Sequence, residues 1–209
     1  MAKDTQPDAF GVNDPIGTRI VQAAAEAIVE HGFGGATTET IARAARTSKR
    51  SLYQRFPDKQ SLFENVMAYL CASAPEAAPD PRPSGDLEAD LRRHALAVLD
   101  RFTQPQTRAV FAAAIGASGQ YPQALEVFWT NGPGQAVDAI AKALSHGKRQ
   151  GKVGPIKPGA TARQFLMNCV GPVVLDQLVS KKTGWTKSAL LSHVDVQISQ
   201  LLSRIKPAP

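Results

Sequence analysis

Between Ser48 and Pro57 the chain gathers side chains that can hydrogen-bond to the bases and phosphates of nucleic acids. Arg50, Tyr53 and Gln54 recur at spacing i, i+3 and i+4, which places them on one face of a helix. Arg and Gln can each form two hydrogen bonds with a base edge in the major groove. Tyr can donate to a phosphate or pack against a sugar or a thymine methyl group. This row therefore has the chemistry of a surface that reads double-stranded DNA.

Two lysines flank the row. Lys49 lies in the first turn of the same predicted helix, and Lys59 lies at the start of the next one. Their ammonium groups can neutralise phosphates on either side of the groove. A solvated, basic helix end would show the same charges, and the residues alone slightly favour that simpler reading. Tyr53 could also pack partly into the core.

Start and stop signals place four helices around this stretch. Ile41, Ala42 and Ala45 follow at core spacing in the second helix, while Leu52 and Phe56 lie four residues apart in the third and should face inward. A long support helix followed by a helix-turn-helix is a DNA-reading arrangement. Residues that favour N-cap positions begin the four helices at Asp14, Thr37, Ser48 and Asp58, and the first and third helices should end at Gly32 and Pro57.

The remainder of the chain also predicts helices. A proline-rich linker or loop spans residues 74–86. Amphipathic helices follow near 86–103, 105–118, 121–150, 160–181 and 186–205, the third of them open to interruption at residues 131–134. No internal repeat and no convincing strand is present, so the sequence predicts an all-α fold.

The net charge of the chain is positive, but its distribution matters more than its size. The 209 residues carry a formal net charge of +6 and a pI of about 9.5, which suits a polyanionic partner. As far as Leu70, however, acidic and basic residues balance at eight each. Binding of nucleic acid must therefore rest on the local row and not on the overall charge.

Other chemistries lack their residues in this sequence. Cys71 and Cys169 are the only cysteines, too few for a disulfide framework or a zinc site. The histidines do not cluster with carboxylates or cysteines, and no nucleophile elbow, phosphate loop or paired-carboxylate motif appears. No signal peptide or membrane span is recognisable. We expect a protein of a reducing compartment that is not an enzyme and has no metal, cofactor or membrane partner.

A joint pattern over Arg19–Phe63, about a quarter of the chain, resembles the N-terminal domain of the tetracycline-repressor (TetR) family of bacterial transcription regulators. One position departs from it, because the turn after the second helix usually carries glycine where this chain has Arg46, and a positive φ there would cost an arginine some strain. The matching residues are Gly32-Phe33, Thr37-Thr38, Ile41-Ala42, Ser48, Leu52-Tyr53, Phe56, Lys59 and Leu62.

The resemblance implies a domain plan and a set of DNA contacts in a bacterial cytoplasm. A flexible arm (1–14) would precede a three-helix helix-turn-helix domain (15–60), and a larger helical domain (61–209) would bind a ligand and dimerise. The positions that lie at or near DNA in the family are Thr37, Thr38, Lys49, Arg50, Ser51, Tyr53, Gln54, Arg55 and Lys59.

Apolar residues of the larger domain are candidates for a ligand cavity. For any one of them ordinary core is the simpler interpretation, and only the family resemblance favours a cavity. Asn168, inside an apolar helix, could orient a ligand, satisfy a backbone group or face a partner subunit. The candidate lining is Phe102, Phe111, Ile115, Phe128, Trp129, Met167 and Asn168.

The last two predicted helices carry a wide apolar stripe that could join two copies of the chain. A monomer could instead bury the stripe against its own core. The candidate interface residues are Phe165, Val173, Leu178, Leu190, Leu191, Val194, Ile198, Leu201 and Leu202.

Together these features predict a homodimeric repressor that binds a palindromic operator and is released by a small, mainly hydrophobic effector. An alternative of the same fold is a regulator without an inducer, or one that responds to oxidation of Cys71 or Cys169. An all-α enzyme or carrier is the alternative from another class, and the missing catalytic motifs argue against it.

Overall fold

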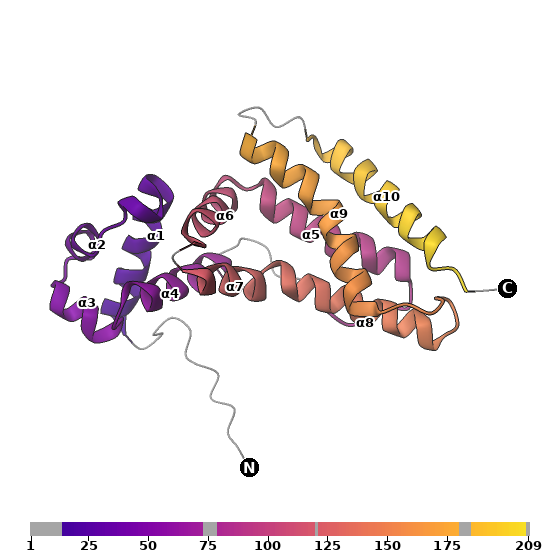
Figure 1. The fold of residues 1–209 in the computed structure, drawn as a ribbon, viewed down its shortest axis with the longest axis horizontal. Coiled ribbons are helices and arrows are strands. Elements are labelled where there is room, and N and C mark those ends of the chain that lie inside the picture. The colour runs from indigo at the N-terminus through magenta and orange to yellow at the C-terminus, as the bar shows by residue number, and fades with distance from the viewer. Residues whose placement is uncertain (1–13, 73–78, 120, 180–184, 208–209) are drawn as a thin grey trace, which may run out of the picture. The chain divides into compact units, whose positions relative to one another are not determined.

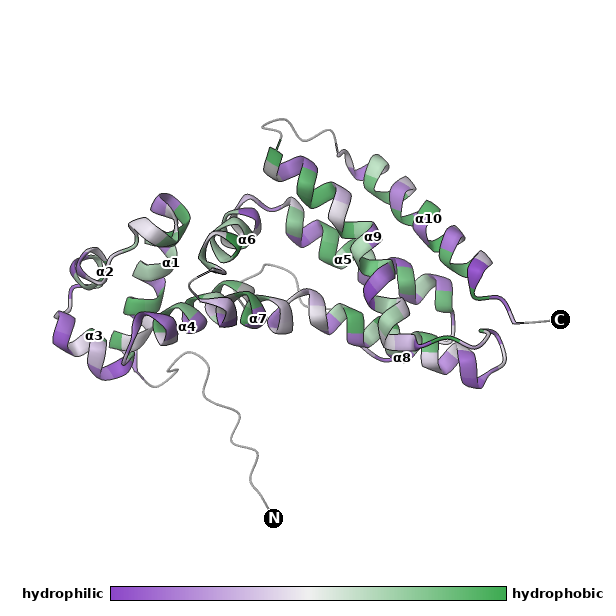
Figure 2. Ribbon diagram, viewed as in Figure 1, coloured by the Kyte–Doolittle hydropathy of each residue, from purple (hydrophilic) through white to green (hydrophobic). Residues whose placement is uncertain are grey.

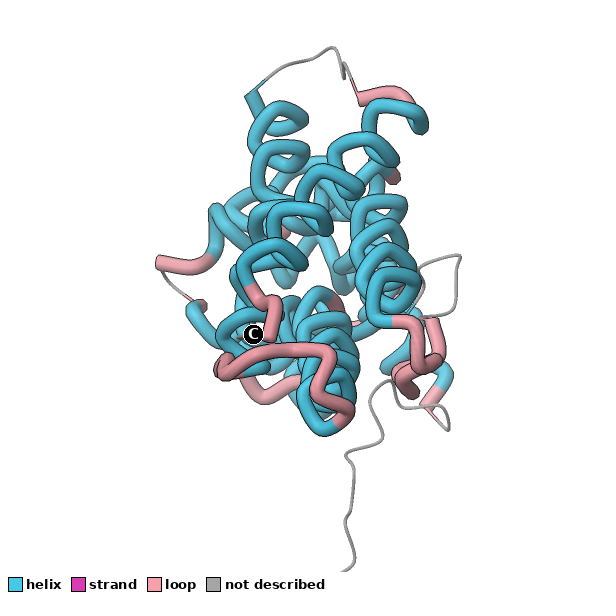
Figure 3. The backbone as a smooth tube through the Cα atoms, turned by 90° about the vertical axis from the view of Figure 1, so that its right-hand side faces the viewer, coloured by secondary structure: helices cyan, strands magenta, loops and turns pink. Residues whose placement is uncertain are grey.

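The computed structural model describes residues 14–72, 79–119, 121–179 and 185–207. In these ranges the regular elements are ten α-helices joined by loops, without a strand (Figures 1 and 3). The predicted all-α fold is confirmed. Residues 1–13 of the expected N-terminal arm and residues 74–78 of the expected linker lie outside the described residues.

The chain divides into two compact units, residues 1–74 with 109–131 and residues 75–108 with 132–209. The first unit contains α1 (Pro15–Gly35), α2 (Thr38–Ala44), α3 (Lys49–Arg55), α4 (Lys59–Ala72), most of α6 (Pro105–Ala117) and α7 (Pro122–Asn131). The second contains α5 (Leu87–Thr103), α8 (Pro133–Arg149), α9 (Pro158–Val179) and α10 (Lys187–Arg204). By packing, α4 and residues 109–131 go with the helix-turn-helix, while the functional division at residue 60 stays a prediction.

The helix starts in the first unit follow from capping side chains. Each capping oxygen accepts a backbone N–H of the first turn, which would otherwise lack an intrahelical partner. The four predicted caps are confirmed, and their partners are Ile16 for Asp14 (3.0 Å), Thr40 for Thr37 (3.2 Å), Ser51 for Ser48 (3.1 Å) and Ser61 for Asp58 (2.6 Å).

An aromatic cluster joins the elements of the first unit behind the helix-turn-helix. At Gly32 the backbone of α1 leaves the helical conformation with φ 70°, which glycine adopts without strain, and Phe33 follows directly. The Phe33 ring packs edge-on against Phe63 of α4, with centroids 4.2 Å apart, and against Tyr121, 4.7 Å away just before α7. These contacts fix α1, α4 and the start of α7 to one another.

Four helices form the core of the second unit. α5 packs against α8, α9 and α10, and α9 packs against α8 and α10. Each helix carries both hydrophobic and hydrophilic residues, so that one side can be buried (Figure 2). The predicted interruption near residue 132 is confirmed, because α7 ends at Asn131 and Pro133 opens α8. Leu91, Leu99, Ile140, Leu144, Leu166 and Ile198 are among its most deeply buried side chains.

A buried carboxylate fastens the end of the proline-rich segment to α5. Asp90 is almost fully buried and accepts hydrogen bonds from the backbone N–H of Ser84 (2.9 Å) and from Arg93 Nη2 (2.8 Å). Arg93 Nη2 also donates to the carbonyl of Asp80 at 3.2 Å. A buried charge needs such partners, so residues 80–84 are tied to α5 rather than left as a free linker.

Within the described ranges, no helix has the length and apolar content to cross a membrane, and no group of three His, Cys, Asp or Glu side chains is arranged to hold a metal ion.

The turn between α2 and α3 closes in the left-handed conformation, and an arginine adopts it. Arg46 has φ 51°, and the N–H groups of Arg46 and Thr47 donate to the carbonyls of Arg43 (3.1 Å) and Ala42 (2.9 Å). This pair of bonds defines a Schellman motif, whose left-handed residue is usually glycine. The conditional expectation of strain at Arg46 is therefore met.

We predict that Arg46→Gly stabilises the protein. Relief of the left-handed strain, roughly 1–2 kcal/mol, exceeds the extra entropy of glycine in the unfolded chain, about 0.5–1 kcal/mol, so the free energy of unfolding should rise by about 0.5–1 kcal/mol. Arg46→Val, which is β-branched, should lower it. Urea unfolding at one protein concentration measures both changes. Equal stability of the two variants would show that the turn carries no strain.

Candidate nucleic-acid interface

The burial of two side chains orients α3. Leu52 is fully buried and Phe56, at the C-cap, is nearly so, as their four-residue spacing predicts. Arg50, Tyr53 and Gln54 are consequently exposed, Tyr53 to 46 %. The structure thus places these three side chains together on the outward side of a short helix.

The exposed row is largely free of internal partners. Within the described part of the chain, the side chains of Arg50 and Gln54 make no hydrogen bond or ion pair. The Tyr53 hydroxyl lies 3.4 Å from Thr38 Oγ1, a long contact that links α3 to α2. Because Arg50 and Gln54 have no internal bond to break, their donors can meet base edges in the major groove directly.

Lys49 lies beside this row and makes only a surface ion pair. Its Nζ is 3.2 Å from Glu39 Oε1 of α2, and both side chains are well exposed. Exposed pairs of this kind contribute little free energy and are screened by salt. A DNA phosphate can therefore compete with Glu39 for Lys49.

Other residues at the expected DNA-contacting positions are already used by the fold. The Thr37 hydroxyl caps α2, and Ser51 Oγ accepts a hydrogen bond from Arg55 Nη1 at 2.7 Å. Arg55 Nε also donates to the Asp14 carboxylate at the start of α1. The structure brings these residues next to the exposed row but gives their polar atoms partners within the protein.

The side chain of Lys59 contacts the end of α1. Its Nζ donates to the Phe33 carbonyl (3.3 Å) and lies 4.5 Å from the centroid of the Phe33 ring. The side chain is half-buried. To reach a phosphate, Lys59 must share or leave these contacts, which Arg50 does not have to do.

The candidate cavity residues do not come together within one unit. Phe111, Ile115, Phe128 and Trp129 belong to the first unit, whereas Phe102, Met167 and Asn168 belong to the second. The rings of Phe111 and Phe128 are tilted by 39° with centroids 5.3 Å apart, and Phe102 and Phe128 are buried. Ile115 and Met167 are exposed, so neither lines an enclosed space within its own unit.

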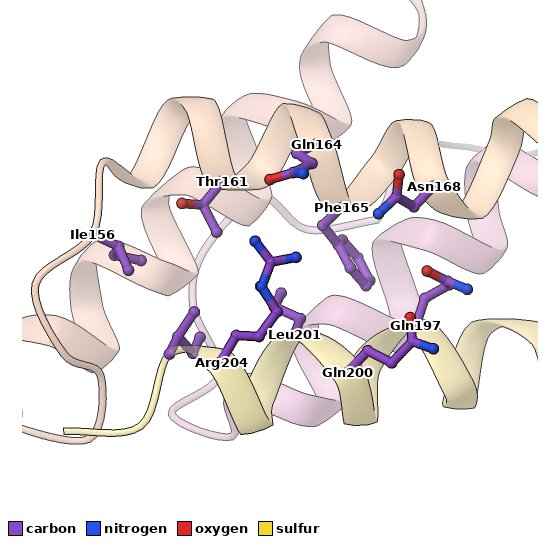
Figure 4. A pocket seen from close by; sticks show the side chains of 10 residues that line it. Ile156, Thr161, Gln164, Phe165, Asn168, Gln197, Gln200, Leu201 and Arg204 are labelled. Atoms are coloured by element: carbon purple, nitrogen blue, oxygen red, sulfur yellow. The ribbon is translucent and has the colours of Figure 1, made fainter. Parts of the chain in front are cut away.

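A hollow of about 140 Å³ lies in the second unit between the first half of α9 and the last half of α10 (Figure 4). The Arg204 guanidinium points into it, toward Gln164 and Thr161. Of the candidate cavity residues only Asn168 lines it. Sequence reasoning missed its polar residues on α10, whose spacing i, i+3 and i+7 was the one available signal: Gln197, Gln200 and Arg204.

The candidate dimer residues are sorted by burial. Six of them pack inside the second unit, as the monomer alternative described: Phe165, Val173, Leu190, Val194, Ile198 and Leu201. Leu191 is exposed and Leu202 is half-buried, while the side chain of Leu178 lies outside the described residues. The most exposed apolar side chains on α9 are instead Leu175 (63 %) and Val179 (87 %).

The helix-turn-helix and the helical second part both match known families. Residues 20–66 match the family described as bacterial regulatory proteins, tetR family, and residues 81–194 match the tetracyclin repressor-like C-terminal domain. The chain belongs to the TetR family of bacterial transcriptional regulators. It is accordingly a DNA-binding helix-turn-helix protein of a family of regulators and not of enzymes.

Curated relatives share part of their length with this chain. The HTH-type transcriptional regulator Rv2250c of Mycobacterium tuberculosis (strain ATCC 25618 / H37Rv) is 33 % identical over 85 residues, which cover 41 % of this chain and 43 % of that protein. The HTH-type transcriptional regulator YvkB of Bacillus subtilis (strain 168) is 27 % identical over 123 residues, 54 % of this chain and 62 % of that one. The chain thus spans about half the length of these relatives.

Solved structures resemble the chain over most of its length. The flavonoid-responsive regulator FrrA superposes with a TM-score of 0.77 and 26 % identity, covering 91 % of this chain and 97 % of FrrA. A TetR regulator from Agrobacterium tumefaciens gives a TM-score of 0.70 at 21 % identity, with 93 % and 96 % covered, and supports the fold alone.

We predict that Arg50→Ala changes which sequence the protein prefers. Loss of a base contact should cost about 1–3 kcal/mol and relax the preference at one position of the site. Lys49→Ala should instead lower affinity for all sequences and reduce the salt slope by about one unit. Lys187→Ala, an exposed lysine of the second unit, is the control. Fluorescence anisotropy with single-base variants measures all three, and an unchanged preference in Arg50→Ala would contradict this orientation of α3.

Proposed function

We propose that the chain is a repressor that binds a palindromic operator as a homodimer and is released by a small, mainly hydrophobic effector. The observation that carries this proposal is the exposed row of Arg50, Tyr53 and Gln54 on α3 of a TetR-family chain. Two such helices related by a two-fold axis would read two equal half-sites, which makes the operator palindromic.

The exposed side of α9 supports a dimer. Met167, Leu175 and Val179 are exposed and follow one another at intervals of eight and four residues, so they form one apolar stripe along the helix. Apolar side chains gathered on the surface mark a contact with another molecule. A second copy of the same stripe, brought up by two-fold symmetry, would cover both.

The likeness to FrrA supports an aromatic effector. FrrA is named as flavonoid-responsive, and the likeness extends over 91 % of this chain. Compounds of that size need a site of roughly 300–1,000 Å³, so the 140 Å³ hollow beside Arg204 is too small for them. The proposed effector is therefore mainly apolar and aromatic, and this hollow is not its site.

The aromatic cluster of the first unit offers a route from effector to DNA. α4 contacts both α1 and α7, and Phe33, Phe63 and Tyr121 hold the three helices together. A shift of residues 109–131 would therefore move α4 and α1, which carry α3. An effector that prefers the shifted state lowers DNA affinity, and DNA lowers effector affinity by the same factor.

Of the two cysteines in the redox alternative, Cys169 is unsuited to sense oxidants. Cys169 is fully buried, and burial raises the pKa of its thiol to about 12. The reactive thiolate is then scarce at neutral pH, which makes Cys169 a poor oxidant sensor. The side chain of Cys71 lies outside the described residues. A regulator without an inducer remains the competing proposal, and the effector experiment decides between them.

The function is tested by selecting genomic fragments with the purified protein and then releasing the best fragment. We predict a palindromic site with a steep salt dependence of binding. A panel of flavonoids should contain a compound that raises the melting temperature and releases this DNA. Ala113 is a buried small residue of α6 within residues 109–131, the segment proposed to shift. Ala113→Phe, which fills space there, should blunt the release and leave DNA binding intact. Selection without enrichment would reject DNA-specific binding, and a panel without any thermal shift would favour the inducer-free regulator.

We predict that Leu175→Glu dissociates the dimer, because it places a charge on the apolar stripe of α9. Analytical ultracentrifugation at micromolar concentration should show a dimer for the parent protein and a monomer for the variant. Gln123→Glu, which adds the same charge at an exposed position of α7, should leave the dimer intact. A parent protein that is monomeric and still binds the palindrome tightly would refute the proposed assembly.

A further inference from the structure

Asp14 connects the start of α1 to the end of α3, across 41 residues of sequence. Its Oδ1 accepts the backbone N–H of Ile16 at 3.0 Å and so caps α1, while its Oδ2 accepts a hydrogen bond from Arg55 Nε. Gly17 leaves room for the carboxylate, because a Cβ there would come within 3.0 Å of Oδ2. One side chain thus serves two helices.

Arg55 extends this link into α3. Its Nη1 donates to the carbonyl of Ser51 (3.2 Å) and to Ser51 Oγ (2.7 Å), one turn earlier in the same helix. The side chains of Arg55 and Asp14 are exposed to only 26 % and 35 %. The pKa of Asp14 is lowered, first by the hydrogen bond from Arg55, which agrees with a formed ion pair. Two of the three guanidinium nitrogens, Nε and Nη1, therefore already have partners within the protein.

The link acts on a helix that has few other constraints. α3 has seven residues, and Leu52 is the one buried residue within it. Phe56, at the C-cap, adds one more buried side chain. Two apolar contacts four residues apart fix which side of a short helix faces inward, but they are not directional and still allow small tilts and shifts. Hydrogen bonds to base edges tolerate only a few tenths of an ångström in distance. The directional link from Arg55 to Asp14, added to these apolar contacts at the end of α3, limits the remaining freedom and holds Arg50 and Gln54 in register.

We propose that Asp14 and Arg55 are positioning residues for the DNA-reading helix, and that Arg55 sets the orientation of α3 through Asp14 instead of contacting DNA. This inference rests on the proposed binding of an operator through α3. It gives Asp14 a part in recognition although Asp14 lies before residues 20–66, the part matched by the DNA-binding family. It also differs from the role that resemblance alone implies for Arg55.

Asp14→Asn distinguishes a positioning role of Arg55 from a phosphate contact, because the two roles predict opposite changes in operator affinity. Asparagine caps a helix about as well as aspartate, so α1 should keep its start while the ion pair is lost. If Arg55 positions α3, operator affinity falls by about tenfold, whereas non-specific affinity and the salt slope stay unchanged. If Arg55 contacts a phosphate, the variant frees it from a competing carboxylate and operator binding becomes tighter.

Two further variants keep the test decisive if Asp14→Asn alters the fold. Arg55→Lys retains the charge but cannot bridge Asp14 and Ser51, so a positioning role predicts loss of specificity and a phosphate contact predicts little change. Asp86→Asn makes the same substitution at the N-cap of α5, where Ala89 N–H is the partner, and should leave operator binding unchanged. Melting temperatures of all variants report their folding.

The measurements use the full-length parent protein and the operator selected with it. Specificity is the ratio of operator affinity to affinity for a scrambled duplex, each measured over a range of salt. Weaker operator binding with a reduced ratio in both Asp14→Asn and Arg55→Lys supports the proposal. Tighter or unchanged operator binding in Asp14→Asn overturns it. Failure of the parent protein to bind any selected DNA would instead reject the proposed function.

Discussion

The burial of Leu52 is the constraint on which DNA reading depends. α3 has seven residues, far fewer than the roughly 12–15 that an isolated helix needs to be stable in water. Its form therefore depends on packing against α1 and α2, and Leu52 is the side chain that α3 contributes to that core. With Leu52 turned inward, Tyr53 and Gln54 have to lie on the outside. The packing of Leu52 in the core thus decides which side chains of α3 face the solvent.

Around this contact the charged residues divide into those that serve the fold and those left for a partner. Arg55 and Lys59 hold α3 and α4 to the two ends of α1 through Asp14 and Phe33. Removing either from its partners to bind DNA would cost the bonds already made. Arg50 makes no such bond among the described residues, so its full capacity remains for bases.

The second unit faces the same kind of choice with apolar residues. A helix can turn an apolar side chain toward its own bundle or toward a second molecule, but not toward both. Val194 and Ile198 of α10 are buried within the unit, while Leu175 and Val179 of α9 are left exposed. The proposed dimer therefore uses the exposed side of α9, although Leu191 and Val196 of α10 are exposed as well.

Local interactions explain what the sequence by itself determined. The caps at Asp14, Thr37, Ser48 and Asp58, the expected ends of the helices to within three residues and the outward row on α3 all depend on neighbours within about one helical turn. Spacing and capping chemistry encode such features directly. Even the strain at Arg46 could be predicted from the sequence, because an arginine stands where this turn usually has glycine.

Only the tertiary structure decided which polar groups already have hydrogen-bond partners within the protein and which apolar groups are already packed in its core. Asp14 and Arg55 are 41 residues apart, and Lys59 and the Phe33 carbonyl are 26 apart, so no periodicity links them. Likewise the period of an apolar stripe does not say whether its own bundle or a partner covers it. Such pairings require distant segments to be packed side by side, and the packing of the whole chain, not local spacing, sets those distances.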